Sequence, residues 1–477
     1  MSRLIAPLVA GFVLLASPGA AAATQVPLAD HVQYAVGGLP NGLAAADLDG
    51  DGDIDIACAN ILSQDVSILF NHGDGTFAAQ VRYPAGGQPR TIAIGDPDGD
   101  GDPDLVVGMQ SGVSLLALLL NDGTGAFSSP VPVGPAPGQP DDIVLGHFDT
   151  DSNLDIAVVL GHEGLVTVFP GQAGAGFRKP KEYAIPSSPV AGGLAAGDVD
   201  GDGDVDLVTT FIYALGAPRV LLNSGNGAFS LAPAFHGDNN ATPAVAVDDL
   251  DGVNGPDLLE VANGVRVYLN KGSGSFGGGL SYDPGVLLSS VTRMALVDLN
   301  VDGAPDVVVT GSSASQVGVL INDGAGAFGP PVAHATGPFT SRVIGADLNG
   351  DGFPDLIASN RDGASVSVLI NQGSATAVRP RPTPSAGFAL GAGFPNPTSS
   401  ATGAFFQLPR ESHVELTVYD VSGRRVRSLA DAWMPAGTHH VRWDGRTERG
   451  QLAPSGVYIL RMKAENFRAT RSIVLVR

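Results

Sequence analysis

Aspartate residues at alternate positions recur in this sequence and offer sets of oxygen ligands. The first such segment, residues 47–55, reads DLDGDGDID, with carboxylates at positions 1, 3, 5 and 9 and a glycine at position 6. Hard cations such as calcium take six to eight oxygen ligands, and carboxylates at alternate positions converge where the backbone turns sharply. The chemistry that this spacing predicts is calcium binding.

Seven segments of this kind recur, beginning at Asp47, Asp96, His147, Asp198, Asp249, Asp298 and Asp347, at intervals of 49 or 51 residues. Five of them keep oxygen ligands at positions 1, 3, 5 and 9, so we expect about five calcium ions per chain. The predicted ligands are Asp47, Asp49, Asp51, Asp53 and Asp55; Asp96, Asp98, Asp100, Asp102 and Asp104; Asp198, Asp200, Asp202, Asp204 and Asp206; Asp298, Asn300, Asp302 and Asp306; and Asp347, Asn349, Asp351 and Asp355.

The third and fifth segments depart from this pattern. The third begins with His147 and has Ser152 in place of the glycine at position 6. Its remaining candidates, which we expect to be weaker ligands, are Asp149, Asp151 and Asp155. The fifth has Val253 at position 5, so a central ligand is missing and we predict that this segment binds no ion.

Two other interpretations of these segments are less consistent with the sequence. An EF-hand needs a glutamate at position 12 and flanking helices, whereas position 12 here is Cys58 or its counterpart in sequence that alternates like a strand. Solvated acidic turns would explain one such segment. They do not explain near-identical segments in at least five repeats at a fixed register.

The elements that position these segments belong to a repeat of about fifty residues. Each aspartate segment is followed by a second marker, such as NHGDGTF ending at Phe77 or NDGTGAF ending at Phe127. Between the markers the sequence alternates in the manner of short strands, as in residues 53–60 and 65–71, and no helical period is present. A repeat of this length with about four strands is typical of a propeller blade. The sequence therefore predicts an all-β, seven-bladed β-propeller over residues 24–377.

The seventh repeat lacks its last strand, and the beginning of the chain resembles the missing piece. Repeat seven ends at residues 371–374, whereas HVQYAVGG (31–38) resembles QVRYPAGG (80–87) after the first marker. We therefore predict that residues 26–46 complete blade seven, which closes the ring and removes an exposed strand edge.

The two motifs, recurring in phase over residues 26–377, resemble the FG-GAP/VCBS-type repeats of integrin α-subunit propellers and many bacterial surface proteins. The resemblance implies a seven-bladed propeller that binds calcium in hairpin loops on one face. It implies no particular ligand.

A second module follows a Pro-rich segment, residues 378–387, which we interpret as a linker. Residues 388–477 carry a net charge of +5, against about −30 for the propeller, and alternate in the manner of a small β-sandwich. The stretches at 394–397, 419–426, 435–445 and 455–458 resemble the Ig-like domain of flagellar hook-capping proteins and type A sorting domains of type IX secretion substrates. This resemblance implies an export or surface-attachment module whose partner is the export machinery, with a purely structural role as the alternative.

The N-terminus and the composition predict the compartment. Residues 1–23 have one arginine, an apolar run and a small-residue tail, which is the layout of a secretory signal peptide. No later segment is apolar for long enough to span a bilayer. The net charge of −22 argues against nucleic acid as a partner. Cys58 is the only cysteine, so no intrachain disulfide is possible, and its apolar surroundings predict a core position. We expect a secreted or surface-located protein.

No catalytic motif of a hydrolase, zinc protease or P-loop enzyme is found, so no catalytic residue is predicted. The preferred function is calcium-dependent binding or adhesion to a protein or glycan through the propeller face. The alternative is a secreted enzyme, a lyase or hydrolase, that acts on polysaccharide. A central cleft with arginine, lysine, histidine or tyrosine side chains would favour the enzyme.

Overall fold

A computed structural model describes residues 26–373 and 389–475, apart from 113, 186–190, 212–217, 234–243, 262, 289–291, 312–314, 395–401, 409, 411, 422–423, 435–436, 444, 450 and 466. The predicted signal peptide and linker lie outside these residues. Within them the chain forms β-strands and one short 3-10 helix, η1 (Arg361–Gly363). No helix in the described ranges is long and apolar enough to cross a membrane.

Four-stranded antiparallel sheets follow one another along the first part of the chain. Sheet one contains β2 (Pro40–Ala46), β3 (Asp55–Asn60), β4 (Asp65–Leu69) and β5 (Val81–Pro84). Sheet two contains β6 (Gly87–Gly95), β7 (Asp104–Gly112), β8 (Leu116–Leu119) and β9 (Val131–Pro132). Sheet three contains β10 (Pro140–Gly146), β11 (Asp155–Leu160), β12 (Leu165–Phe169) and β15 (Lys181–Ala184), with a separate hairpin of β13 (Gly171–Gln172) and β14 (Gly176–Phe177).

The remaining sheets of this part repeat the same order. Sheet four contains β16 (Ala191–Gly197), β17 (Asp206–Phe211), β18 (Arg219–Asn223) and β19 (Phe229–Leu231). Sheet five contains β20 (Ala244–Asp248), β21 (Asp257–Val261), β22 (Val265–Tyr268) and β23 (Leu280–Tyr282). Sheet six contains β24 (Met294–Val297), β25 (Asp306–Gly311), β26 (Gln316–Leu320) and β27 (Val332–Ala335). Sheet seven contains β28 (Thr340–Ala346), β29 (Asp355–Asn360), β30 (Ser365–Leu369) and β1 (Val32–Ala35).

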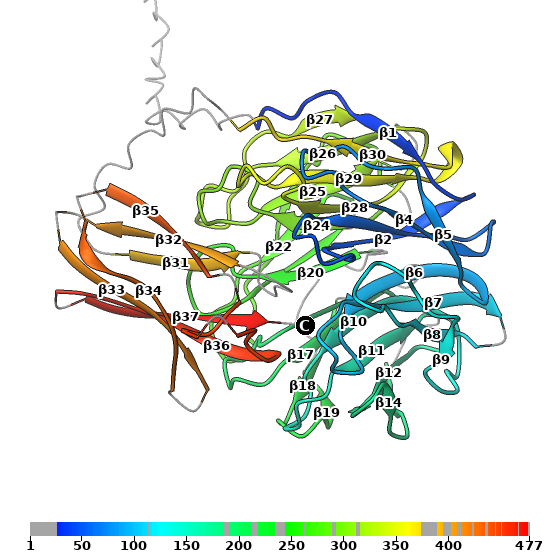
Figure 1. Ribbon diagram of the computed structural model, residues 1–477, viewed down its shortest axis with the longest axis horizontal. Coiled ribbons are helices and arrows are strands. Elements are labelled where there is room, and N and C mark those ends of the chain that lie inside the picture. The colour runs from blue at the N-terminus through cyan, green and yellow to red at the C-terminus, as the bar shows by residue number, and fades with distance from the viewer. Residues whose placement is uncertain are drawn as a thin grey trace, which may run out of the picture.

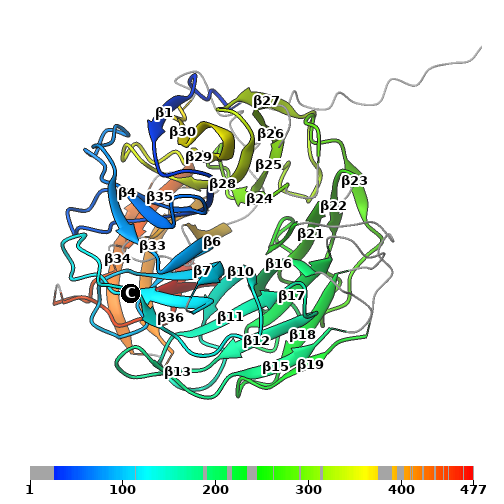
Figure 2. The same cartoon turned by 90° about the vertical axis from the view of Figure 1, so that its right-hand side faces the viewer.

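These sheets are arranged as a ring (Figure 2). The first strand of each sheet contacts the first strand of the next, and β28 of the last sheet contacts β2 of the first. The ring closes through β1, which pairs antiparallel with β30 from Val32 opposite Val368 to Ala35 opposite Ser365. The predicted closure is therefore confirmed, but its bounds were wrong: residues 40–46 form β2, the first strand of sheet one. Because a four-residue turn separates β1 from β2, one segment serves two blades.

The core of the ring lies between neighbouring sheets. All six residues of β3, DIACAN, are buried, and Cys58 is 0% exposed, as its apolar surroundings predicted. Strands buried on both faces are expected to be continuously apolar. Near the axis the sheets approach so closely that a Cβ at Gly193 would lie 3.0 Å from the backbone nitrogen of Val245. Small residues in the first strands therefore allow the ring to close tightly.

The C-terminal part forms a separate two-sheet sandwich (Figure 1). One sheet contains β31 (Ala389–Phe394), β32 (Thr402–Leu408) and β35 (Gly437–Trp443). The other contains β34 (Arg425–Met434), β33 (Ser412–Asp420), β36 (Gly456–Ala464) and β37 (Phe467–Leu475). Its hydrophobic cluster, which includes Phe406, Trp443 and Tyr458, contains residues of this part alone. The predicted sandwich architecture is confirmed, with a core of its own.

Candidate metal centre

The seven aspartate segments form loops between the first and second strands of the sheets, and we number them one to seven from residues 47–55 to residues 347–355. In loop one the backbone wraps around Asp47, whose two carboxylate oxygens accept hydrogen bonds from Gly50 N (2.8 Å) and Gly52 N (3.0 Å). These glycines have φ of +79° and +99°, which side chains rarely adopt. The turn predicted at position 6 is therefore present, and it aims the loop oxygens toward one point.

The structure gathers the carboxylates at positions 1, 3 and 9. One oxygen from each lies within 4.8 Å of the other two in four loops. The groups are Asp47, Asp49 and Asp55; Asp96, Asp98 and Asp104; Asp198, Asp200 and Asp206; and Asp249, Asp251 and Asp257. Two oxygens that each lie about 2.4 Å from one calcium ion are at most about 4.8 Å apart. The spacing of these donors therefore fits calcium.

The aspartates at positions 5 and 7 are not members of these groups. In loop one, Asp51 uses one oxygen to accept a hydrogen bond from Asp53 N (2.9 Å). The sequence assigned a ligand role to position 5 in loops one, two, four, six and seven, and to position 7 in loops one, two and four, and that role remains a prediction.

Position 9 connects each metal loop to the second marker of its own sheet. Asp55 is 1% exposed, and its oxygens accept hydrogen bonds from Leu48 N (2.9 Å) and Asn71 N (2.8 Å). In loop two, position 2 is Pro97, which has no N–H to donate, and Oδ2 of the buried Asp104 has no hydrogen-bond partner. An orphaned carboxylate oxygen in a buried acidic loop is the environment in which a cation is stabilising.

Without a cation these loops hold like charges close together. Burial raises the pKa of the position 9 aspartates, and nearby carboxylates raise it further, although backbone hydrogen bonds oppose the shift. The pKa is raised to about 7 in Asp55, about 8 in Asp104 and about 6 in Asp206. Keeping these buried carboxylates ionised therefore costs free energy. A bound divalent cation would offset that cost because its charge favours the ionised form.

Loops six and seven carry asparagine at position 3. The amides of Asn300 and Asn349 donate to Asp302 (2.9 Å) and Asp351 (3.0 Å). Burial raises the pKa of Asp298 and of Asp355 to about 7. Oδ1 of Asp347 is buried and has no hydrogen-bond partner. Both loops therefore retain oxygen donors and the same electrostatic demand, although neither gathers three carboxylates within 4.8 Å in the described residues.

Loop five gathers carboxylates at the same three positions as loop one, although its sequence predicted that it binds no ion. Val253 at position 5 is 51% exposed and supplies no ligand, yet Asp249, Asp251 and Asp257 gather as in loop one. Asn254 adopts the left-handed conformation (φ +63°) in place of the usual glycine. Because asparagine tolerates this conformation, the sequence could have predicted that loop five keeps the same turn as loop one. That it binds no ion remains a prediction.

Loop three is organised differently. His147 at position 1 is hydrogen-bonded through Nδ1 to Asn153 O (2.9 Å) instead of wrapping the backbone around a carboxylate. Asp149 and Asp151 form ion pairs with Arg178. The structure therefore does not bring its predicted ligands together in the way that it does in loops one, two and four.

An asparagine of the second marker links six of the seven blades to the one before it; blade three has Gly171 at this place. Nδ2 of Asn71 donates to Ile54 O in its own blade (2.9 Å) and to Leu348 O in loop seven (2.7 Å). Equivalent links to the preceding loop are made by Asn121, Asn223, Asn270, Asn322 and Asn371. The aspartate loops are therefore part of the contacts between blades, a role of the asparagines that the sequence did not reveal.

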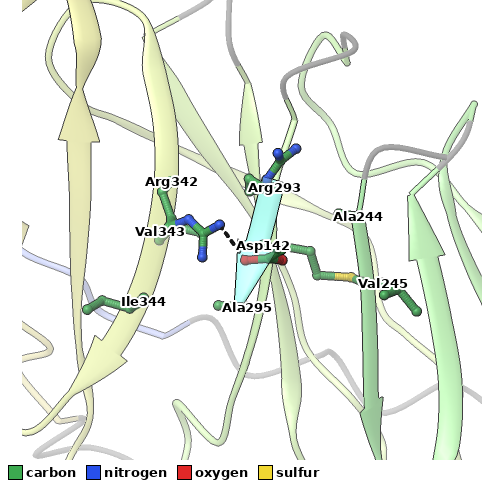
Figure 3. A pocket seen from close by; sticks show the side chains of 9 residues that line it. Asp142, Ala244, Val245, Arg293, Ala295, Arg342, Val343 and Ile344 are labelled. Atoms are coloured by element: carbon green, nitrogen blue, oxygen red, sulfur yellow. Dashed lines mark hydrogen bonds and ion pairs between the residues drawn. The ribbon is translucent and has the colours of Figure 1, made fainter. Parts of the chain in front are cut away.

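A second cluster of charged side chains lies at the axis of the ring. Arg342 of β28 forms an ion pair with Asp142 of β10 (2.9 Å), which belongs to a sheet across the ring (Figure 3). Arg90 pairs with the neighbouring Asp141. Burial and the nearby Arg342 lower the pKa of Arg293 to about 10. Asp142, Arg293 and Arg342 border a cavity of about 130 Å³.

Sequence comparison identifies both parts of the chain. Residues 47–107, 97–158, 147–209 and 298–358 match the FG-GAP-like repeat, and residues 397–467 match the FlgD Ig-like domain. No match to a functionally curated protein was found.

Solved structures share the propeller architecture at low identity. The BP39L lectin from Burkholderia pseudomallei is 18% identical over 71% of this chain and 98% of its own, with a TM-score of 0.54. BBS1N, solved in complex with ARL6DN, is 14% identical over 73% and 98%, with a TM-score of 0.50. A lectin of Agrocybe aegerita that recognises non-reducing terminal N-acetylglucosamine is 20% identical over 70% and 86%, with a TM-score of 0.48. At these identities the likeness to BP39L and to BBS1N shows the fold alone.

Proposed function

We propose that this chain of FG-GAP-like repeats followed by a FlgD Ig-like domain is an exported, calcium-stabilised propeller that binds a glycan or protein ligand. The observation that carries the proposal is the recurrence of one carboxylate arrangement, at positions 1, 3 and 9, in loops one, two and four, where position 5 is also an aspartate. Similar groups at equivalent places of a repeated fold are expected of a repeated ligand site.

Calcium would hold the rim of the ring in a fixed shape. The position 9 aspartates bond to the second marker of their own sheet and, except for Asp104, to their own loop, and in six blades the asparagine of the marker bonds to the preceding blade. An ion at the loop therefore stabilises contacts between blades as well as the loop itself. A rigid rim with variable loops between the blades is a suitable platform for recognition.

Glycan is the ligand that we would test first. The BP39L protein of the same fold is a lectin, and export would bring this acidic propeller into contact with extracellular glycans. We also propose that the chain attaches to a surface or to export machinery, and the match to the FlgD Ig-like domain supports this.

A polysaccharide-acting enzyme is the second candidate, and the arginines at the ring axis are the observation that favours it. The cavity at the ring axis has a volume of about 130 Å³, which is smaller than the roughly 300–1,000 Å³ typical of ligand pockets. Its described lining contains arginine and aspartate but no lysine, histidine or tyrosine, and Asp142 is paired with Arg342. We therefore place binding before catalysis.

The experiment is a glycan and protein array probed with the full mature chain in millimolar calcium and again in chelator. Calcium-dependent retention on a defined ligand class supports the proposal. Release of reducing ends or unsaturated products from polysaccharides, with no stable binding, would favour the enzyme instead.

A further inference from the structure

Loop three contacts a cationic side chain, Arg178, that lies outside its nine residues. Nη2 of Arg178 lies 3.1 Å from Oδ2 of Asp149, pairs with the carboxylate of Asp151 and donates to Gly171 O (3.1 Å). One guanidinium therefore joins positions 3 and 5 of the loop to the second marker of the same sheet. This is the connection that we propose calcium to reinforce in loop one.

The backbone of loop three also departs from that of a metal loop. Positions 4 and 6 are left-handed in loop one, at Gly50 and Gly52, and the same two positions are left-handed in loops two, four, five, six and seven. In loop three, Thr150 and Ser152 stand at these positions, and neither has a positive φ. Position 1 is His147, which cannot supply the two oxygens around which the other loops turn.

The arginine stands at a place where the other blades have small residues. Arg178 directly follows the phenylalanine of the second marker. The residues at this place in the other blades are Ala78, Ser128, Ser230, Gly277 and Gly329. The only loop that lacks an acidic position 1 is therefore the only one followed by a long cationic side chain there.

We infer that Arg178 is a built-in cation that replaces calcium in loop three, so that blade three keeps its acidic loop closed without binding a metal ion. A guanidinium presents several donors in a fixed plane and remains charged at all relevant pH values. It offsets part of the negative charge of the loop permanently, whereas an ion does so only at concentrations above its dissociation constant. This inference rests on the proposed calcium binding by the other loops.

The test compares matched variants of the full mature chain, with bound calcium counted by elemental analysis after equilibration in millimolar calcium. Asp49→Ala in loop one should remove one ion per chain, and Asp149→Ala at the same position of loop three should remove none. Loss of one ion from Asp149→Ala would overturn the inference. If neither wild type nor Asp49→Ala holds calcium, the proposed function fails instead.

A second variant removes the cation itself and does not depend on metal counting. Arg178→Ser introduces the residue found in blades two and four, and it should lower the melting temperature in chelator by roughly 1–2 °C because the pair is partly exposed. The control Lys179→Ser removes the same charge from the adjacent exposed residue and should leave the melting temperature unchanged. An Arg178→Ser protein that melts in chelator like wild type would overturn the inference.

Discussion

The propeller and the C-terminal sandwich are both all-β, but within the residues that the structure describes the propeller buries charged side chains and the sandwich does not. The propeller buries an aspartate at position 9 of every loop, each at 1% exposure or less. The sandwich buries no carboxylate in its described residues, and its core includes Trp443, Tyr458 and Phe406. The ring therefore depends on charge compensation at its rim and on closure, whereas the sandwich depends on packing alone. A protein built in this way should respond to metal and pH in one part only.

Removing the closing strand should have the largest effect. Deletion of residues 26–39 removes β1, leaves β30 paired with β29 alone, and exposes the interface between sheets seven and one. We expect loss of the whole propeller transition in differential scanning calorimetry in millimolar calcium, with the sandwich transition retained. A deletion variant whose propeller melts like wild type would contradict ring closure as a source of stability.

Truncating a side chain of the sandwich core should destabilise the sandwich and leave the propeller unaffected. Trp443 is 1% exposed, its ring centroid lies 4.8 Å from that of Tyr458, and its Nε1 donates to Arg446 O (2.9 Å). Trp443→Ala should destabilise the sandwich by about 3–5 kcal/mol. Calorimetry should then show an unchanged propeller transition, and a joint loss of both transitions would show that the two parts unfold as one unit.

The asparagine link between blades should have an intermediate effect. Asn71→Ala leaves Ile54 O and Leu348 O without their donor at the junction of sheets one and seven, at a cost of about 1–3 kcal/mol. Asp74→Ala in the same turn is the control, since the Asp74 side chain bonds only locally to Thr76. Equal melting temperatures for the two variants would refute a role for Asn71 in joining blades.

The smallest effect is the pH dependence of the metal-free ring. In chelator the raised pKa values of Asp55, Asp104 and Asp206 mean that protonation favours the folded state. This contribution is fully present below about pH 4 and is lost as pH rises through about 6–8. The propeller should therefore melt at a higher temperature at pH 5.5 than at pH 8 in chelator. A propeller that melts at a lower temperature at pH 5.5 would contradict these shifts.

The sandwich should serve as the internal reference over this range. Two carboxylates in the described part of the sandwich have shifted pKa values. Hydrogen bonds from Lys463 and Arg410 lower the pKa of Glu415 and of Glu465, respectively. Their stabilising contribution is lost only as pH falls below about 4.5. Between pH 5.5 and 8 these groups predict no change in the sandwich transition.

Local patterns predicted much of the fold. The alternation at 53–60 and 65–71 indicated strands, and β3 and β4 lie there. The match between residues 31–38 and 80–87 predicted ring closure because both segments form the fourth strand of a sheet. The boundary was misplaced at residues 40–46, since the similarity continues past the end of β1 at Ala35 and does not show which sheet the next strand joins.

The loops show where pattern reasoning fails. Positions 1, 3 and 9 were predictable because the turn brings them together locally. The ion pairs of Arg178 are also local, but Arg178 lies outside the nine-residue pattern, 23 positions after Asp155, so the pattern alone does not include it. The Asn71 link to Leu348 joins residues 277 apart in sequence, so only the closed ring reveals it.

Calcium binding at the rim is tested most directly by counting ions in the purified mature protein after equilibration in millimolar calcium and removal of excess. Loops one, two and four combine the full acidic sequence with gathered carboxylates, so at least three calcium ions per chain should be bound, and about five if loops six and seven also bind. Chelation should then lower the propeller transition and leave the sandwich unchanged. Fewer than three ions per chain, or no shift of the propeller transition on chelation, would contradict the account.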